Sequence, residues 1–136
     1  MENEMERMES DVNDITWQVS PLSTVHEPLS QPGALSEGPV KFLLVSGATD
    51  DGRWGLVGAY WLSIDAERGG FVVSPNAIWT GTELVRSLTG ALDRGWDAER
   101  IYAFWRNQVG MAGKVMIDPQ QHADTLFHVA RRVGAL

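Results

Sequence analysis

Two apolar segments on either side of a short turn constrain the fold of this chain more than any other feature. Residues 40–46 (VKFLLVS) and residues 54–64 (WGLVGAYWLSI) are rich in β-branched, aromatic and other apolar residues, which favours strands. The intervening segment, 47–52 (GATDDG), contains an Asp-Gly pair that tolerates the positive φ of a tight turn. We therefore expect an antiparallel hairpin. Gly55 and Gly58 in the second strand indicate a β-bulge or a close approach of another backbone.

The segment that follows the hairpin predicts a third strand and a helix. A turn over 65–70 leads to a strand at 71–74, which ends before Pro75. Thr80 and Glu83 have the spacing of a capping box, so we expect a helix to start there and to end at Gly95. Its predicted buried face consists of Leu84, Val85, Leu88, Ala91 and Leu92.

The last third of the chain predicts two more strands and a second helix. Residues 100–105 (RIYAFW) and 114–117 are the predicted strands, with a turn over residues 106–113 between them. Asp118 with Pro119 predicts the start of the last helix. We expect one α+β domain over residues 40–136. Its mainly antiparallel five-stranded sheet has the order βββ-α-ββ-α, with two helices on one face and an N-terminal arm.

Residues 1–39 differ in composition from the rest of the chain and predict an acidic arm with a Pro-rich linker. Four of the six prolines lie between residues 21 and 39. The segment has one basic residue, Arg7, against eight acidic residues, which are Glu2, Glu4, Glu6, Glu9, Asp11, Asp14, Glu27 and Glu37. The net charge of −7 therefore belongs to the arm. An acidic arm on a neutral body repels nucleic acid and anionic membranes, so we expect a protein partner.

The start of the arm has an apolar stripe, which predicts a short helix over residues 2–15. The stripe consists of Met1, Met5, Met8, Val12 and Ile15, spaced 4, 3, 4 and 3 residues apart. Two heptads are too short to form a stable helix alone, so the stripe needs a surface to dock on. Residues 15–19 then read as a short strand or a docking peptide, with Trp17 and Val19 on one side.

The tryptophans predict a contact surface in the body. Five of the six lie beyond residue 40, and a domain of this size rarely encloses five indoles completely. Both faces of the 54–64 strand are apolar, so we expect Trp61 to lie on a sheet face that a partner covers, and Trp79 to be an exposed loop anchor. The predicted partner-binding residues are Met1, Met5, Met8, Val12, Ile15, Trp17, Trp61 and Trp79.

An alternative function is a metal-dependent nuclease. The βββα order, with Asp50 and Asp51 near the first hairpin and Glu83 at a helix start, resembles the ribonuclease-H-like nucleases. That resemblance implies a magnesium site on Asp51, Glu83 and Asp118. Strand 100–105 lacks the aspartate that this family's fourth strand carries.

The arm and the apolar sheet instead favour a non-enzymatic interaction or assembly module. The element order and acidity resemble type III secretion chaperones, and an arm that threads onto neighbours also suits a viral head or tail component. We expect self-association or a protein partner, a homo-oligomer, no cofactor and no metal. No apolar run approaches the roughly 20 residues of a membrane span, and the chain has no cysteine, so we expect a cytoplasmic location or packaging into a cytoplasmically built assembly.

Overall fold

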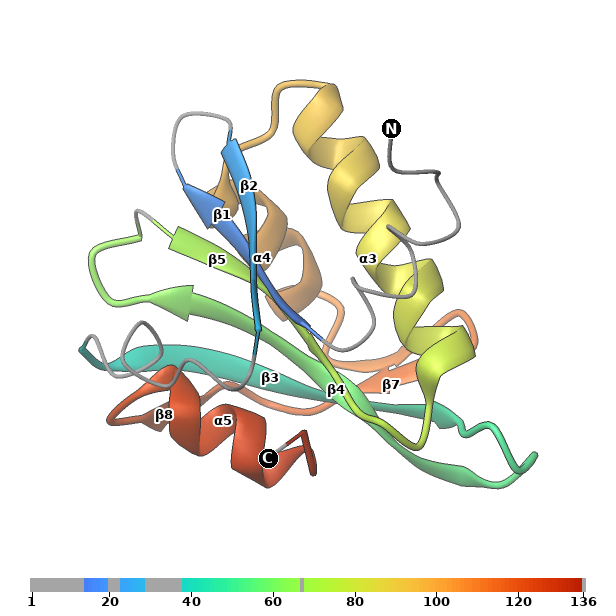
Figure 1. The fold of residues 1–136 in the computed structure, drawn as a ribbon. Coiled ribbons are helices and arrows are strands. Elements are labelled where there is room, and N and C mark those ends of the chain that lie inside the picture. Colours follow the sequence, from blue (N-terminus) through green and yellow to red (C-terminus); the bar gives the residue numbers. More distant parts are fainter. Residues whose placement is uncertain (1–13, 20–22, 29–37, 67, 136) are drawn as a thin grey trace, which may run out of the picture.

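The computed structural model describes residues 14–19, 23–28, 38–66 and 68–135 (Figure 1). The strands are β1 (Asp14–Val19), β2 (Ser23–Pro28), β3 (Val40–Ala48), β4 (Trp54–Ser63), β5 (Arg68–Val73), β6 (Gly110–Ala112), β7 (Val115–Ile117) and β8 (Gln121–Ala123). The helices are α3 (Ile78–Asp93), α4 (Ala98–Arg106) and α5 (Leu126–Arg132). The predicted α+β class with an antiparallel sheet is confirmed. None of the described helices is long and apolar enough to cross a membrane.

The strands form one antiparallel sheet in the order β2-β1-β5-β4-β3-β7-β6, with β8 also paired to β3. The β3–β4 hairpin predicted from the sequence lies at its centre. The sheet has more strands than the five expected because β1 and β2 extend it beyond β5. β2 falls within the segment 20–39 that we expected to be an unpaired linker, and β1 covers the predicted strand at residues 15–19.

Gly58 sits where the sequence predicted a bulge or a close backbone approach, and both are present. The register of β3 against β4 shifts between Val45 and Ser46, so that Val45 faces Gly58 and Ser46 faces Leu56. A Cβ at Gly58 would lie 2.2 Å from the Val72 carbonyl oxygen and 2.6 Å from the Phe71 ring. No side chain fits that space, so glycine is required there.

The helices lie on both faces of the sheet rather than on one (Figure 1). α3 and α4 cover the face that carries Leu43, Tyr60 and Phe71. α5 covers the other face, against Phe42 and Trp61. The two-helices-on-one-face prediction is therefore wrong. The alternation of strand side chains gives the sheet two apolar faces, and each needs its own cover.

Residues 100–105 form a helix, α4, and not the predicted strand. The Asp97 carboxylate caps this helix by accepting a hydrogen bond from the Arg100 amide at 2.8 Å. Ala98, Ile101, Tyr102 and Trp105 are spaced three or four residues apart and face the core, which is the period of a helix. The aromatic content of RIYAFW suggested a strand, but the capping residue and this spacing determine the element.

α3 begins two residues before the predicted capping box, and its cap comes from another part of the chain. Its N-cap residue, Ala77, offers no side-chain cap. Asp50, in the β3–β4 turn, accepts hydrogen bonds from the amides of Ile78 at 3.1 Å and Trp79 at 3.2 Å. The Thr80 hydroxyl donates to the Ala48 carbonyl at 2.8 Å. The hairpin tip is thereby fastened to the start of α3.

The last helix also starts later than predicted. Asp118 and Pro119 lead into β8, and α5 begins only after Thr125. The strand is favoured because residues 121–123 pair with the free edge of β3 over Val40 to Phe42. The predicted strand at 114–117 is present as β7, and the expected turn before it contains β6.

Candidate interaction surface

One end of the sheet exposes a row of apolar side chains on the face that α5 covers elsewhere. Met111 of β6 faces Met116 of β7, Met116 faces Ser46 of β3, and Ser46 faces Leu56 of β4. Residues opposite each other on neighbouring strands have side chains on the same face. Leu56 packs at the margin of the α5 cluster, which identifies the face, and Trp54 lies two residues further along β4.

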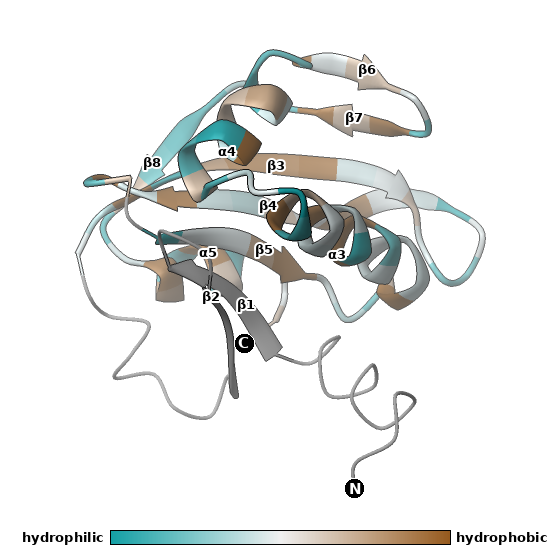
Figure 2. Ribbon diagram, turned by 90° about the horizontal axis from the view of Figure 1, so that it is seen from above, coloured by the Kyte–Doolittle hydropathy of each residue, from teal (hydrophilic) through white to brown (hydrophobic). Residues whose placement is uncertain are grey.

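We call the side chains of Trp54, Leu56, Met111 and Met116 the open sheet end. Trp54 is 55% exposed, Met111 61% and Met116 38%. The neighbours of Met116 along β7, Val115 and Ile117, are buried against α3 and α4 on the opposite face. Figure 2 shows the hydrophobic colouring of β6 and β7 at this edge of the sheet. Among the described residues, α5 covers Leu56 only in part and leaves Trp54, Met111 and Met116 exposed.

A groove of about 640 Å³ adjoins the open sheet end. Trp54 and Leu56 form part of its wall, together with the hairpin tip, the loop from Ser74 to Asn76 and the end of α5 from Arg132 to Gly134. Its lining mixes apolar rings with arginine and backbone groups. Such a lining suits an amphipathic polypeptide segment better than a small apolar molecule.

Two exposed cations lie next to this surface. Lys114 lies in the turn between β6 and β7, and Arg132, at the end of α5, lines the groove. The nearby acids are engaged elsewhere: Asp50 caps α3, and Asp51 pairs with Arg53 at 3.8 Å. Hydrogen bonds from the Thr49 hydroxyl and the Arg53 amide lower the pKa of Asp51. Lys114 and Arg132 therefore place two positive charges beside the open sheet end.

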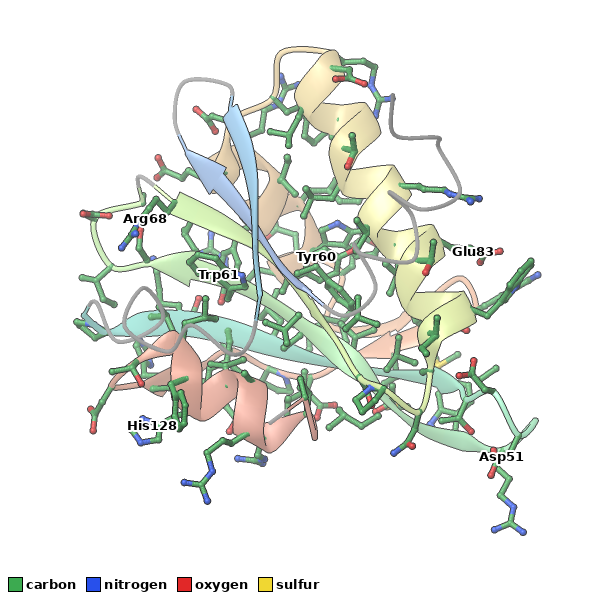
Figure 3. The ribbon with its side chains drawn as sticks, in the orientation of Figure 1. Asp51, Tyr60, Trp61, Arg68, Glu83 and His128 are labelled. Atoms are coloured by element: carbon green, nitrogen blue, oxygen red, sulfur yellow. The ribbon has the colours of Figure 1, made fainter. Side chains whose placement is uncertain are left out.

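Trp61 is not on an exposed sheet face, contrary to the expectation from the sequence. It is 1% exposed and belongs to the core under α5, with Phe42, Leu126 and Val129. Figure 3 shows Trp61 and Tyr60 on opposite sides of the sheet. A partner could not reach Trp61 without displacing α5, whereas the other end of the same face is less covered.

Trp79 is the most exposed large apolar residue among those described, at 76%. It lies in the first turn of α3 instead of the predicted loop, next to half-exposed Ile78. Its role in partner binding stays a prediction.

The other predicted partner-binding residues lie in the arm. Ile15 and Trp17 belong to β1, whose backbone pairs with β5. Met1, Met5, Met8 and Val12 lie outside the described residues.

The acids of the alternative nuclease site are not brought together. Figure 3 shows Asp51 at the hairpin tip and Glu83 on α3, well apart. Asp118 follows β7, where its amide donates to the Leu44 carbonyl. Within the described ranges, no group of three or more His, Asp or Glu side chains could hold a metal ion. The magnesium site implied by the nuclease resemblance has no counterpart in this part of the chain.

His122 of β8 and His128 of α5 lie in a separate hollow of about 360 Å³. His122, Asp124, His128 and Arg132 line it. The His128 ring is within 3.2 Å of the Thr125 hydroxyl at the start of α5, which accounts for its orientation. Arg132 lines both this hollow and the groove beside the open sheet end, so the two depressions adjoin at the end of α5.

Sequence reasoning missed Met111 and Met116. Residues 106–113 were expected to form a turn, so Met111 had no predicted face. One signal was present: Gly113 separates two three-residue apolar runs, GMA and VMI, and each has a methionine at its centre. Gly113 has a φ of +66°, as a tight hairpin turn requires.

Comparison with protein families, with curated proteins and with solved structures finds no match to this chain. The site geometry alone supports the functional argument below.

Proposed function

We propose that the protein is a non-enzymatic protein–protein interaction or assembly module, of the adaptor or chaperone-like kind, and that the open sheet end is its contact surface. The observation that supports this most directly is the register row from Met111 through Met116 to Leu56, which exposes large apolar side chains beside Trp54. Contiguous exposed apolar patches on a folded domain commonly mark protein contacts.

The residue types favour contact with a polypeptide. Methionine and tryptophan are enriched at protein interfaces, where methionine adapts its shape and tryptophan supplies a large buried area. The apolar centre has a polar rim that includes Arg132 and Lys114. An apolar centre with a polar rim is the usual arrangement of a protein interface.

The simplest form of this contact is self-association, in which the open sheet ends of two copies pack against each other. The test is the molar mass of the full chain by light scattering over a range of protein concentrations. We expect a mass that rises reversibly with concentration in the wild type. Met111→Lys places a charge in the exposed row and should return the protein to the monomer mass.

Ile64→Lys is the matched control. Ile64 is 49% exposed and follows the end of β4 away from the hairpin tip, so the same substitution there adds the same charge outside the open sheet end. Circular dichroism should show that both variants fold. A wild-type mass that stays monomeric throughout, or one that both substitutions alter equally, would contradict the proposed surface.

A further inference from the structure

We infer that residues 1–13 of the same chain dock on the open sheet end and compete with a partner for it. This inference rests on the proposed function, because it concerns the same surface. It identifies the occupant by four properties of the segment: where it starts, how far it reaches, its apolar side chains and its charge.

The pairing of β1 places the start of this segment beside the groove. β1 runs antiparallel to β5, with Thr16 opposite Phe71 and Val19 opposite Arg68. Continuing this register by two residues brings Asp14 level with Val73. The loop after Val73, Ser74–Asn76, lines the groove next to Trp54. Residues 1–13 therefore leave the sheet at the end where its apolar row is exposed.

The segment is long enough to cover the row. From β1, where the segment begins, to β7 the sheet order crosses β5, β4 and β3, which makes four strand spacings, or roughly 19 Å at about 4.8 Å each. A helix of 13 residues is about 20 Å long. A helix over these residues can therefore extend from the start of β1 to Met116 of β7.

The apolar side chains of residues 1–13 are of the same type as those of the open sheet end. All five methionines of the chain lie either in the stripe of the arm or in the open sheet end: Met1, Met5 and Met8 in the first, Met111 and Met116 in the second. Flexible thioether side chains pack into irregular apolar surfaces, so methionine on both sides tolerates an imperfect fit.

The charges match as well. Residues 1–13 contain five acids and one base, while Arg132 lines the groove and Lys114 lies in the turn between β6 and β7. The exposed acid at the hairpin tip, Asp51, is already paired with Arg53. Because a tethered segment meets its site at a high effective concentration, docking within one chain outcompetes docking between chains at low protein concentration.

The test is a nuclear Overhauser experiment on the full chain labelled with ¹³C at the methionine methyl groups. Five signals are expected, and single Met→Leu variants assign them. We expect contacts between the Met5 or Met8 methyls and those of Met111 or Met116, unchanged on dilution. Contacts that vanish on dilution would overturn the inference in favour of a second copy. The absence of any arm-to-sheet contact would overturn it outright.

Two matched variants add a functional readout. Met8→Glu puts a charge into the stripe, and Ser10→Glu adds the same charge outside it. We expect Met8→Glu to shift the Met111 and Met116 signals and to raise self-association, with Ser10→Glu close to wild type. Equal effects of the two variants would contradict docking through the stripe.

The outcomes also separate this inference from the proposed function. Methyl contacts in a chain that never self-associates would support the docked arm and refute the self-association form of the proposed function. Self-association that Met111→Lys abolishes, without methyl contacts within one chain, would support the surface and refute the docked arm.

Discussion

Two glycines of α3 provide a sharp test of how this helix packs on the sheet. Gly81 and Gly90 are nine residues apart, so at about 100° per residue they point to opposite sides of the helix. A Cβ at Gly81 would lie 2.5 Å from Val73 Cγ1, whereas a Cβ at Gly90 would meet nothing closer than an Arg94 guanidinium nitrogen at 3.5 Å. Replacing glycine by alanine should therefore lower the free energy of unfolding at Gly81 and raise it at Gly90.

The magnitudes follow from these distances. Alanine in place of glycine stabilises a helix interior by about 0.5–1 kcal/mol, which is the expected gain for Gly90→Ala. Gly81→Ala receives the same gain but must displace Val73, which is buried in β5 and stiff at its branched Cβ. Such overpacking costs about 1–3 kcal/mol. We expect a net loss of about 1–2 kcal/mol at Gly81.

Chemical denaturation of the two variants beside the wild type measures this contrast. The difference between their free energies of unfolding should be about 2–3 kcal/mol, with Gly90→Ala the more stable. Because both sites lie in one helix, its intrinsic propensity cancels in the comparison. If Gly81→Ala were as stable as Gly90→Ala, the close contact of α3 with β5 would be wrong.

Three further predictions concern the core. Leu88→Ala should lower the free energy of unfolding by about 2–4 kcal/mol, since Leu88 lies on the buried face of α3; a loss below roughly 1 kcal/mol would place it outside the core. Tyr60→Phe should raise stability by up to about 1 kcal/mol, because the buried Tyr60 hydroxyl has no hydrogen-bond partner among the described residues; a clear loss in a melting experiment would reveal a partner. Burial raises the pKa of both tyrosines, Tyr60 and Tyr102, so the folded state stays protonated where the unfolded state ionises. Stability should therefore fall as pH rises above about 10, without a phenolate absorbance band before unfolding; a band that titrates near pH 10 in folded protein would contradict this.

The parts of the fold that were predictable from sequence are those with strong local signals. Hydrophobic strands beside an Asp-Gly turn predicted β3 and β4, and Gly58 predicted the bulge. The buried face of α3 was also predicted, since Leu84, Val85, Leu88, Ala91 and Leu92 are all in the core. Local pattern suffices where the period and the turn residues agree.

The errors occurred where a distant segment decides the local structure. The start of α3 depends on Asp50, 28 residues earlier in the sequence, and no capping motif near Ile78 reveals it. β8 exists because the edge of β3 is available to residues 121–123. α4 was read as a strand because its aromatic content outweighed the Asp97 cap in our interpretation.

The candidate surface, too, was predictable only in the part that local sequence pattern determines. Apolar residues on both faces of β4 correctly indicated that both faces need cover, but only the folded chain shows that α5 buries Trp61 fully and Leu56 only in part. Met111 and Met116 join the row through pairing of β6, β7 and β3, which sequence spacing does not predict. Exposure at one sheet end is thus a property of the tertiary structure.

The measurement that tests the central claim most directly is the light-scattering mass of the full chain, of Met111→Lys and of Ile64→Lys at matched concentrations. If the open sheet end is the contact surface, wild type and Ile64→Lys will associate to the same extent and Met111→Lys will remain a monomer. Equal masses for all three proteins would show that the surface formed by Trp54, Leu56, Met111 and Met116 does not mediate self-association.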